Sequence, residues 1–124
     1  MGGMRVLLVD DEPELVHTMA ERLEIRDFEV DAVTSGAAAL EKIKSEAYDV
    51  VVIDLKMPGM SGHAVMTAVR VEHPRLPIIL LTGHGAAEDD EENADLDQAC
   101  AYLFKPINID ELIRTMRECV KVDE

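Results

Sequence analysis

Short apolar runs alternate with longer segments of mixed polarity along this chain. Five of these runs are rich in β-branched or aromatic residues and have the length of β-strands. They cover Arg5–Val9, Phe28–Val33, Asp49–Asp54, Pro77–Leu81 and Ala101–Phe104. Within the third run, Val50–Ile53 is apolar at every position, which is typical of a central strand of a parallel sheet that is covered on both faces. The pattern predicts a sheet of five strands.

The segments between the runs show apolar residues at the three- and four-residue steps of amphipathic helices. Pro13 opens the first helix, which is predicted to end near Arg26; Ser61 is expected to cap the third, which ends near Glu72; and Asn108 with Glu111 resembles a capping box before the last. We expect inward-facing side chains at Leu15, Val16, Met19 and Leu23, then at Ala37, Leu40, Ile43 and Ala47, then at Val65, Met66, Ala68 and Val69, and finally at Leu112, Met116 and Val120.

This alternation of strand and helix predicts right-handed βαβ crossovers and therefore an α/β fold with a doubly wound parallel sheet. With five strands and no glycine-rich first turn, the strand order 2-1-3-4-5 of flavodoxin-like folds is preferred, with five helices. The fourth helix would cover Glu88–Asp97, which has seven acids in ten residues. We expect this helix to be mobile or poorly packed, and its acids to form either a solvated face or a docking patch for a basic partner.

Length and charge argue against several classes of function, namely nucleic-acid binding and membrane spanning. The 124 residues suffice for one domain. The formal charge of −14 and the lack of a basic patch argue against direct binding of nucleic acid. The apolar runs, Ile78–Leu81 among them, are far shorter than the roughly 20 residues of a bilayer span. No secretory segment precedes the first strand, so we expect a cytoplasmic protein that does not contact membranes.

The two cysteines, Cys100 and Cys119, lie in apolar contexts. Buried, reduced thiols are the favoured interpretation over a disulfide or a metal pair, and no chemistry is assigned to them. His17, His63 and His73 show no spacing typical of metal ligands.

Polar residues follow four of the predicted strands. Asp10 and Asp11 come after the first strand, Asp54 ends the third, and Thr82 and Lys105 follow the fourth and fifth. Because the carboxyl ends of parallel strands share one edge of the sheet, these residues should converge. Crowded carboxylates need a cation, and an all-oxygen set suits Mg²⁺. Capping of a helix N-terminus is the alternative for Asp10 and Asp11 when they are taken alone.

Four motifs carry a family resemblance. They are Val9–Pro13 (VDDEP), Asp54–Gly59 (DLKMPG), Leu81–Gly85 (LTGHG) and Lys105–Pro106. Through them the chain resembles a response-regulator receiver domain of bacterial two-component signal transduction, which is CheY-like, over residues 4–121. The resemblance suggests that the Lys105–Pro106 peptide bond is cis.

The resemblance implies a phosphorelay role. Asp54 would accept a phosphoryl group from a sensor histidine kinase, a phosphotransfer protein or a small phosphodonor. Asp10, Asp11, Asp54 and the backbone carbonyl of Lys56 would hold Mg²⁺, with Asp10 acting largely through water.

The resemblance also implies a switch. Thr82 and Tyr102 would respond to the phosphoryl group, and Lys56 and His84 would influence its lifetime. The output face would consist of the fourth helix, the fifth strand and the fifth helix. This face would act on a downstream domain or protein, and a homodimer would form through it.

Physical chemistry supports these roles independently of the resemblance. A carboxylate can attack phosphorus once its repulsion from the phosphoryl oxygens is cancelled, which Mg²⁺ and Lys105 could do. Self-phosphorylation and dephosphorylation would then serve signalling, and the chain would not be an enzyme in the usual sense. A phosphatase of the haloacid-dehalogenase kind is one alternative, but it needs an acid where Lys56 stands. A pseudo-receiver that only binds partners is the second, and the intact acidic set argues against it.

Overall fold

The structure, a computed structural model, describes residues 3–83 and 99–122 and contains one parallel sheet of five strands. The strands are β1 (Arg5–Val9), β2 (Glu29–Val33), β3 (Val50–Asp54), β4 (Ile78–Thr82) and β5 (Ala101–Phe104). Their order in the sheet is β2-β1-β3-β4-β5. The predicted α/β class, the parallel sheet and the strand order are therefore confirmed.

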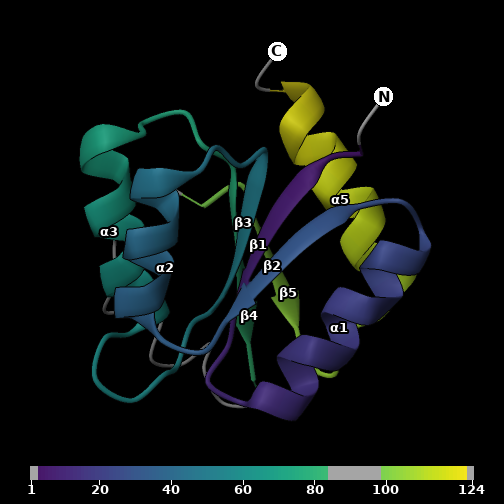
Figure 1. Cartoon of the computed structure of the whole chain (residues 1–124), viewed down its shortest axis with the longest axis horizontal. Coiled ribbons are helices and arrows are strands. Elements are labelled where there is room, and N and C mark those ends of the chain that lie inside the picture. The colour runs from purple at the N-terminus through teal and green to yellow at the C-terminus, as the bar shows by residue number, and fades with distance from the viewer. Residues whose placement is uncertain (1–2, 84–98, 123–124) are drawn as a thin grey trace.

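Helices cover both faces of the sheet. In the described ranges they are α1 (Pro13–Ile25), α2 (Gly36–Ser45), α3 (Gly62–Glu72) and α5 (Ile109–Val122). Figure 1 shows α1 and α5 on one face and α2 and α3 on the other. The helix expected over the acidic tract at 88–97 lies outside the described residues. None of the helices in the described ranges has the length and apolar character needed to cross a bilayer.

The core has two halves because the central strands bury side chains on both faces. Val6 and Leu8 of β1 pack with α1 and α5, while Leu7 and Val9 pack with α2 and α3. All five residues of β3 and of β4 are buried. The continuous apolar runs in the sequence follow from this two-sided burial, which holds the ends of β1, β3 and β4 in fixed positions.

Side-chain caps begin three of the helices. Oγ of Ser35 accepts a hydrogen bond from the Ala38 N–H at 3.1 Å, and Oγ of Ser61 accepts one from the Ala64 N–H at 3.1 Å. Oδ1 of Asn108 accepts the N–H of Glu111 at 3.0 Å. The predicted caps at Ser61 and Asn108 are therefore confirmed.

Three expected inward-facing alanines are exposed instead. Ala37 and Ala68 lie on the solvent side of α2 and α3, and Ala47 lies beyond the end of α2. Ala39 takes the buried position on α2, and Met66 is fully buried on α3 as expected. A methyl group gains little from burial, so alanine marks the inward side of a helix weakly. β2 also begins one residue later than predicted, and β4 is shifted by one residue to Ile78–Thr82.

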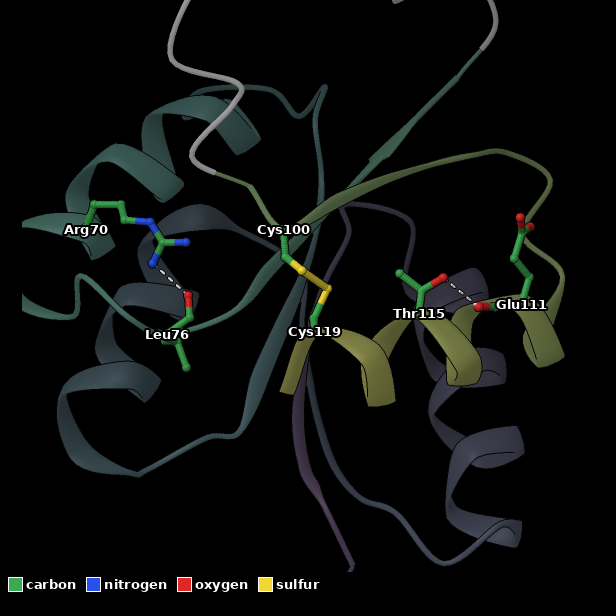
Figure 2. The surroundings of a disulfide bond; sticks show 6 residues. All are labelled: Arg70, Leu76, Cys100, Glu111, Thr115 and Cys119. Carbon is green, nitrogen blue, oxygen red and sulfur yellow. Dashed lines mark hydrogen bonds between the residues drawn. A yellow bond between two sulfur atoms is a disulfide. The ribbon is translucent and has the colours of Figure 1, made fainter. Parts of the chain in front are cut away.

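The prediction of two reduced cysteines was wrong. Cys100 and Cys119 form a disulfide, with their Cα atoms 6.0 Å apart. Figure 2 shows the bridge joining the chain just before β5 to α5. The two residues are 19 positions apart. They meet because α5 runs back along the sheet after β5, a tertiary relationship that the spacing does not reveal.

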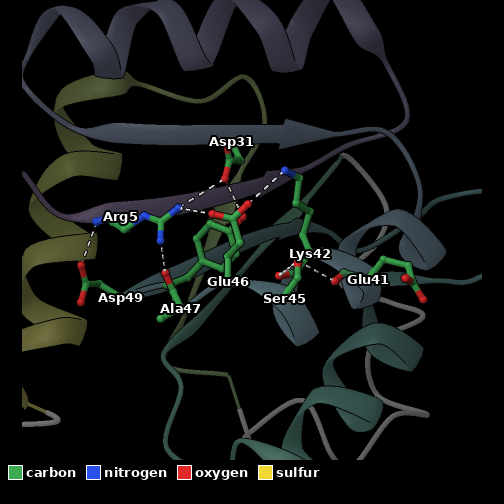
Figure 3. A network of polar contacts seen from close by, with 9 residues as sticks. Arg5, Asp31, Glu41, Lys42, Ser45, Glu46, Ala47 and Asp49 are labelled. Atoms are coloured by element: carbon green, nitrogen blue, oxygen red, sulfur yellow. Dashed lines mark hydrogen bonds and ion pairs between the residues drawn. The ribbon is translucent and has the colours of Figure 1, made fainter.

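A polar network closes the amino end of the sheet (Figure 3). The Arg5 guanidinium donates to Oε1 of Glu46 at 2.7 Å and lies 3.7 Å from Asp31, and the Arg5 backbone N–H donates to Asp49 at 2.8 Å. The Tyr48 hydroxyl donates to Asp31 at 2.6 Å. Burial, together with this hydrogen bond, raises the pKa of Tyr48. These contacts tie β1 and β2 to the end of α2.

Candidate functional site

Three carboxylates meet at the carboxyl edge of the sheet. Asp10 and Asp11 follow β1, and Asp54 is the last residue of β3. One oxygen from each of the three lies within 4.8 Å of the others. Asp10 is 1% exposed and Asp54 is 5% exposed, whereas Asp11 is partly exposed. The predicted convergence of these acids is what the structure shows.

Lys105 brings an amine into the same cluster. Its Nζ donates to Oδ2 of Asp10 at 3.0 Å and to Oδ2 of Asp54 at 3.3 Å. The same Nζ lies 3.8 Å from Oε1 of Glu12, a contact that the sequence did not lead us to expect. Glu12 adjoins Asp11 in the first motif, which is the signal that could have identified it. The site therefore holds four carboxylates around one ammonium group among the described residues.

The surroundings raise the pKa values of both Asp54 and Lys105. Burial raises the pKa of Asp54, and the charge of Asp10 raises it further, against the opposing effects of Lys105 and of the Lys56 N–H. Burial alone would lower the pKa of Lys105, but its hydrogen bond to Asp10 and the charges of Asp54 and Asp10 raise it. The fold therefore disfavours the ionised form of Asp54, whereas Lys105 stays protonated and positively charged.

Local backbone contacts hold the carboxylates in place. Oδ1 of Asp54 accepts the N–H of Lys56 at 3.3 Å, and Oδ1 of Asp10 accepts the N–H of Glu12 at 3.0 Å. The N-cap of α1 is Glu12, whose side chain makes no capping hydrogen bond within the described ranges. Asp10 and Asp11 precede that N-cap, so the metal interpretation of these acids is favoured over helix capping.

Glycine at position 62 lets α3 begin directly against the Asp54 backbone. A Cβ atom at Gly62 would overlap the carbonyl oxygen of Asp54 and would lie 2.8 Å from Cα of Leu55. The Gly62 N–H also donates to the Leu55 carbonyl at 2.8 Å. The turn between them includes Gly59, whose φ of 81° suits glycine. This close packing fixes the end of β3 and the chain just after it.

Thr82 lies on the strand beside Asp54. β4 pairs with β3 so that Leu81 is opposite Asp54, and Thr82 is the next residue and is 1% exposed. The Thr82 carbonyl accepts the N–H of Lys105 at 2.8 Å, which couples the ends of β4 and β5. The Lys105–Pro106 peptide bond is cis, as expected.

The remaining predicted residues are less closely tied to the cluster. Tyr102 lies on β5 opposite Leu80 and is 38% exposed. Lys56 is exposed, and its backbone contacts Asp54. His84 lies outside the described residues.

The donor set fits a hard divalent cation. The carboxylates of Asp10, Asp11 and Asp54 supply only oxygen. Among the described residues, the ammonium of Lys105 is the one cation bonded to them, which leaves a local excess of negative charge. Mg²⁺ accepts such ligands and keeps several waters, so three carboxylates from two strands suffice. The cluster could hold this ion.

Comparison with known proteins agrees with the geometry. The sequence pattern of the family described as the response regulator receiver domain matches residues 6–117. The chain belongs to the response regulator receiver domain family. Members of this family accept phosphoryl groups in two-component signalling, so this receiver domain is a signalling switch.

Several relatives of this receiver domain are named transcriptional regulatory proteins. It is 35% identical over 117 residues to the transcriptional regulatory protein TcrA of Mycobacterium tuberculosis, covering 94% of this chain and 46% of that protein. It is 36% identical over 118 residues to TctD of Salmonella typhimurium, covering 95% and 52%. The chain thus spans about half the length of these relatives.

Solved structures share the fold of the receiver domain. The response regulator TrrA of Thermotoga maritima, in complex with Mg²⁺–BeF, has a TM-score of 0.83 and 34% identity, with 94% of this chain and 98% of that one covered. A receiver domain protein of Clostridium thermocellum has a TM-score of 0.88 and 28% identity, with 96% and 95% covered.

Proposed function

We propose that residues 4–121 form a single receiver domain that accepts a phosphoryl group on Asp54 in an Mg²⁺-dependent reaction. The observation that carries this proposal is the placement of the Lys105 amine against Asp54 and Asp10, within the three-carboxylate cluster. The complex of TrrA with Mg²⁺–BeF supports it, because TrrA is a response regulator of the same fold.

The chain's own groups perform most of the chemistry. An Oδ of Asp54 attacks the phosphorus of the donor, the bond to the leaving group breaks, and an aspartyl phosphate forms. Lys105 holds Asp54 and faces the incoming phosphoryl oxygens with its positive charge. Asp10, Asp11, Asp54 and the Lys56 carbonyl would hold Mg²⁺, which supplies charge neutralisation when bound. Water later hydrolyses the acyl phosphate and restores Asp54.

Thr82 is the residue through which the phosphoryl group would be sensed. Phosphorylation replaces one negative charge with about two and adds strong hydrogen-bond acceptors. The Thr82 hydroxyl, which now donates to the Gly83 carbonyl at 3.4 Å, is free to exchange this weak bond for one to the phosphoryl group. Tyr102 on the adjacent strand would follow, which alters an output face built on β5, α5 and the fourth helix.

Lys56 and His84 would set the lifetime of the phosphoryl group, because each lies two residues beyond a site residue, Asp54 and Thr82 respectively. Replacing both with alanine should change the rate of dephosphorylation. This rate is measured as the decay of the phosphorylated protein after the donor has been removed. An unaltered rate would contradict the role proposed for Lys56 and His84.

The partners follow from the same assignment. A sensor histidine kinase or a phosphotransfer protein would donate the phosphoryl group in the cytoplasm, and a downstream domain or protein would read the output face. The relatives named above are transcriptional regulators, which makes a regulator of transcription one destination of the signal. A homodimer through the output face is a further element of the proposal.

Phosphorylation with acetyl phosphate tests the function. The protein is incubated with Mg²⁺ and the donor, and intact mass reports addition of one phosphoryl group. Asp54→Asn should abolish the addition, and so should a chelator, whereas Asp110→Asn, a matched change at an exposed aspartate on α5, should not. Addition that persists in Asp54→Asn contradicts the assignment. Turnover of phosphate esters without a stable aspartyl phosphate would instead favour a phosphatase, and lack of any reaction would favour a pseudo-receiver.

A further inference from the structure

The Cys100–Cys119 disulfide closes a covalent ring that contains Lys105. Cys100 directly precedes β5, and Lys105 directly follows it. The chain then continues into α5, which carries Cys119 near its end (Figure 2). The bridge and the site lysine therefore lie at opposite ends of β5. The disulfide fastens β5 to α5 at the end that is remote from the acids.

The same ring is joined to β4 at both ends of β5. The Cys100 N–H donates to the carbonyl of Ile78, the first residue of β4, at 2.7 Å. The Lys105 N–H donates to the carbonyl of Thr82, the last residue of β4, at 2.8 Å. The two residues at the ends of β5 are thus the bridge cysteine and the site lysine, and one regular ladder connects them.

The two sulfur atoms have different surroundings. Cys100 is an exposed residue, whereas Cys119 is 4% exposed and packs in the core with Leu112 and Met116 of α5. Of the two bridge residues, Cys100 is therefore the one on the surface, and a dithiol would approach from its side. After the bridge opens, the thiol of Cys119 can stay buried in the core, because a free cysteine behaves as a small apolar side chain.

We propose that this disulfide is a redox modification site, reduced by a dithiol, and that its state controls the affinity of the receiver site for phosphoryl groups. The proposal rests on the proposed function of Asp54. A reductant thiolate attacks Sγ of Cys100, the S–S bond breaks, and its electron pair goes to Sγ of Cys119, which takes up a proton. The second thiol of the reductant then displaces Cys100 as a thiol. Two electrons and two protons pass to the protein, and the reductant leaves as a disulfide.

The coupling arises because Lys105 must adjust when a phosphoryl group joins Asp54. Its amine now bonds to Asp54 and Asp10 at 3.3 and 3.0 Å, and the phosphoryl oxygens come to occupy part of that space. The movement is taken up by β5 or by α5, and the bridge holds these two elements together. Opening the bridge lets β5 move without α5, so the reduced chain binds the phosphoryl group more tightly.

Beryllofluoride binding in the two redox states tests the proposal. The oxidised chain and the chain reduced with dithiothreitol are each titrated with beryllofluoride and Mg²⁺ by calorimetry, and mass after thiol alkylation confirms the state of the cysteines. We expect the reduced chain to bind at least about fivefold more tightly, in the usual range of coupling between sites. By reciprocity, bound beryllofluoride should shift the thiol–disulfide equilibrium in a dithiol buffer toward the reduced chain by the same factor.

Cys100→Ser is the matched control. It removes the bridge at an exposed position, so it should bind like the reduced wild type whether or not dithiothreitol is present. Equal affinity of the oxidised and reduced wild-type chains overturns the coupling and leaves the function of Asp54 intact. A bridge that resists dithiothreitol in the folded chain overturns the modification site. Lack of binding in both states overturns the proposed function, and the coupling with it.

Discussion

Nζ of Lys105 donates a 3.0 Å hydrogen bond to Oδ2 of Asp10, a residue 95 positions earlier in the chain. The bond joins the end of β5 to the end of β1, although β3 and β4 lie between these strands in the sheet. The long lysine side chain spans that distance and reaches Asp54 on the way. One ammonium group thus links three strand ends, and most of the expected behaviour of the site depends on it.

Removing the amine should weaken both the chemistry and the fold. In Lys105→Met, Asp10 and Asp54 remain buried without their cation, which typically costs about 3 kcal/mol of stability in the absence of Mg²⁺. Phosphorylation by acetyl phosphate should fall below detection. Lys42→Met, at a partly exposed lysine of α2 that pairs with Glu46, is the control and should keep both properties. Urea unfolding and intact mass are the measurements.

Neutralising Asp54 should stabilise the metal-free protein. Burial first, and the charge of Asp10 second, raise the pKa of Asp54 above its value in the unfolded chain. The folded state therefore disfavours the carboxylate, and this penalty is absent below the unfolded pKa and grows as the pH rises through the folded pKa. Asp54→Asn should raise the free energy of unfolding by roughly 1 kcal/mol at neutral pH, a gain that is common when a destabilising charge in a functional site is removed.

The gain of Asp54→Asn should shrink at acidic pH, because the raised pKa lets the wild-type carboxyl of the folded chain take up a proton there. Unfolding in chelator at the two pH values measures it, with Asp110→Asn as the exposed control. A gain that is larger at acidic pH than at neutral pH would contradict this assignment of the charge.

Mg²⁺ should stabilise the chain through the acid cluster. At a concentration about 100 times the dissociation constant, a ligand of the folded state adds about 2.7 kcal/mol. Asp11→Asn removes one of the three clustered carboxylates, and we expect the affinity for Mg²⁺ to fall about tenfold or more. Thermal unfolding at a series of Mg²⁺ concentrations reports the stabilisation and the affinity for Mg²⁺. Glu41→Gln, at an exposed acid of α2, should leave both quantities unchanged.

Adding a methyl group at Gly62 should displace Asp54, the proposed phosphoacceptor. The new Cβ would overlap the Asp54 carbonyl and lie 2.8 Å from Cα of Leu55, and backbone atoms cannot yield as a flexible side chain can. We expect Gly62→Ala to cost about 2 kcal/mol, as overpacked sites do, and to slow phosphorylation. Gly83→Ala is the stability control because, among the described residues, a Cβ there meets nothing within 4 Å. Equal stability of the two variants would refute the packing argument.

Reduction of the disulfide should lower stability as well as alter binding. A bridge across 19 residues restricts the unfolded chain, and closing a loop of this size is worth about 3 kcal/mol. The midpoint of urea unfolding should therefore fall when dithiothreitol is added. Cys100→Ser should unfold at the lower midpoint under both conditions.

The strand ends and their chemistry could be predicted because the sheet is buried on both faces. Short runs that are apolar at every position and rich in β-branched residues indicate strands buried on both faces. Parallel strands bring their carboxyl ends to one edge, so Asp10, Asp54 and Lys105 were expected to meet. The helix faces were harder to predict where alanine was the marker, since Ala37 and Ala68 are exposed.

The disulfide could not be predicted in the same way. Whether Cys100 meets Cys119 depends on how far α5 runs back beside the sheet, and neither residue carries a local signal for that. The contact of Glu12 with Lys105 likewise depends on a side chain at the rim of the site, for which hydrophobic patterning holds no information.

Carboxylates outnumber cations at the strand ends, so a metal cation should enter the site before the phosphodonor does. Among the described residues, Asp10, Glu12 and Asp54 lie around one ammonium, that of Lys105, and Asp11 adjoins Asp10 and Asp54, within a chain whose formal charge is −14. A phosphodonor is itself an anion and is repelled until that surplus is cancelled, whereas a small cation is drawn in from a distance. Screening by salt should therefore slow the entry of the cation and hasten that of the anion, so ionic strength would act on the two encounters in opposite directions.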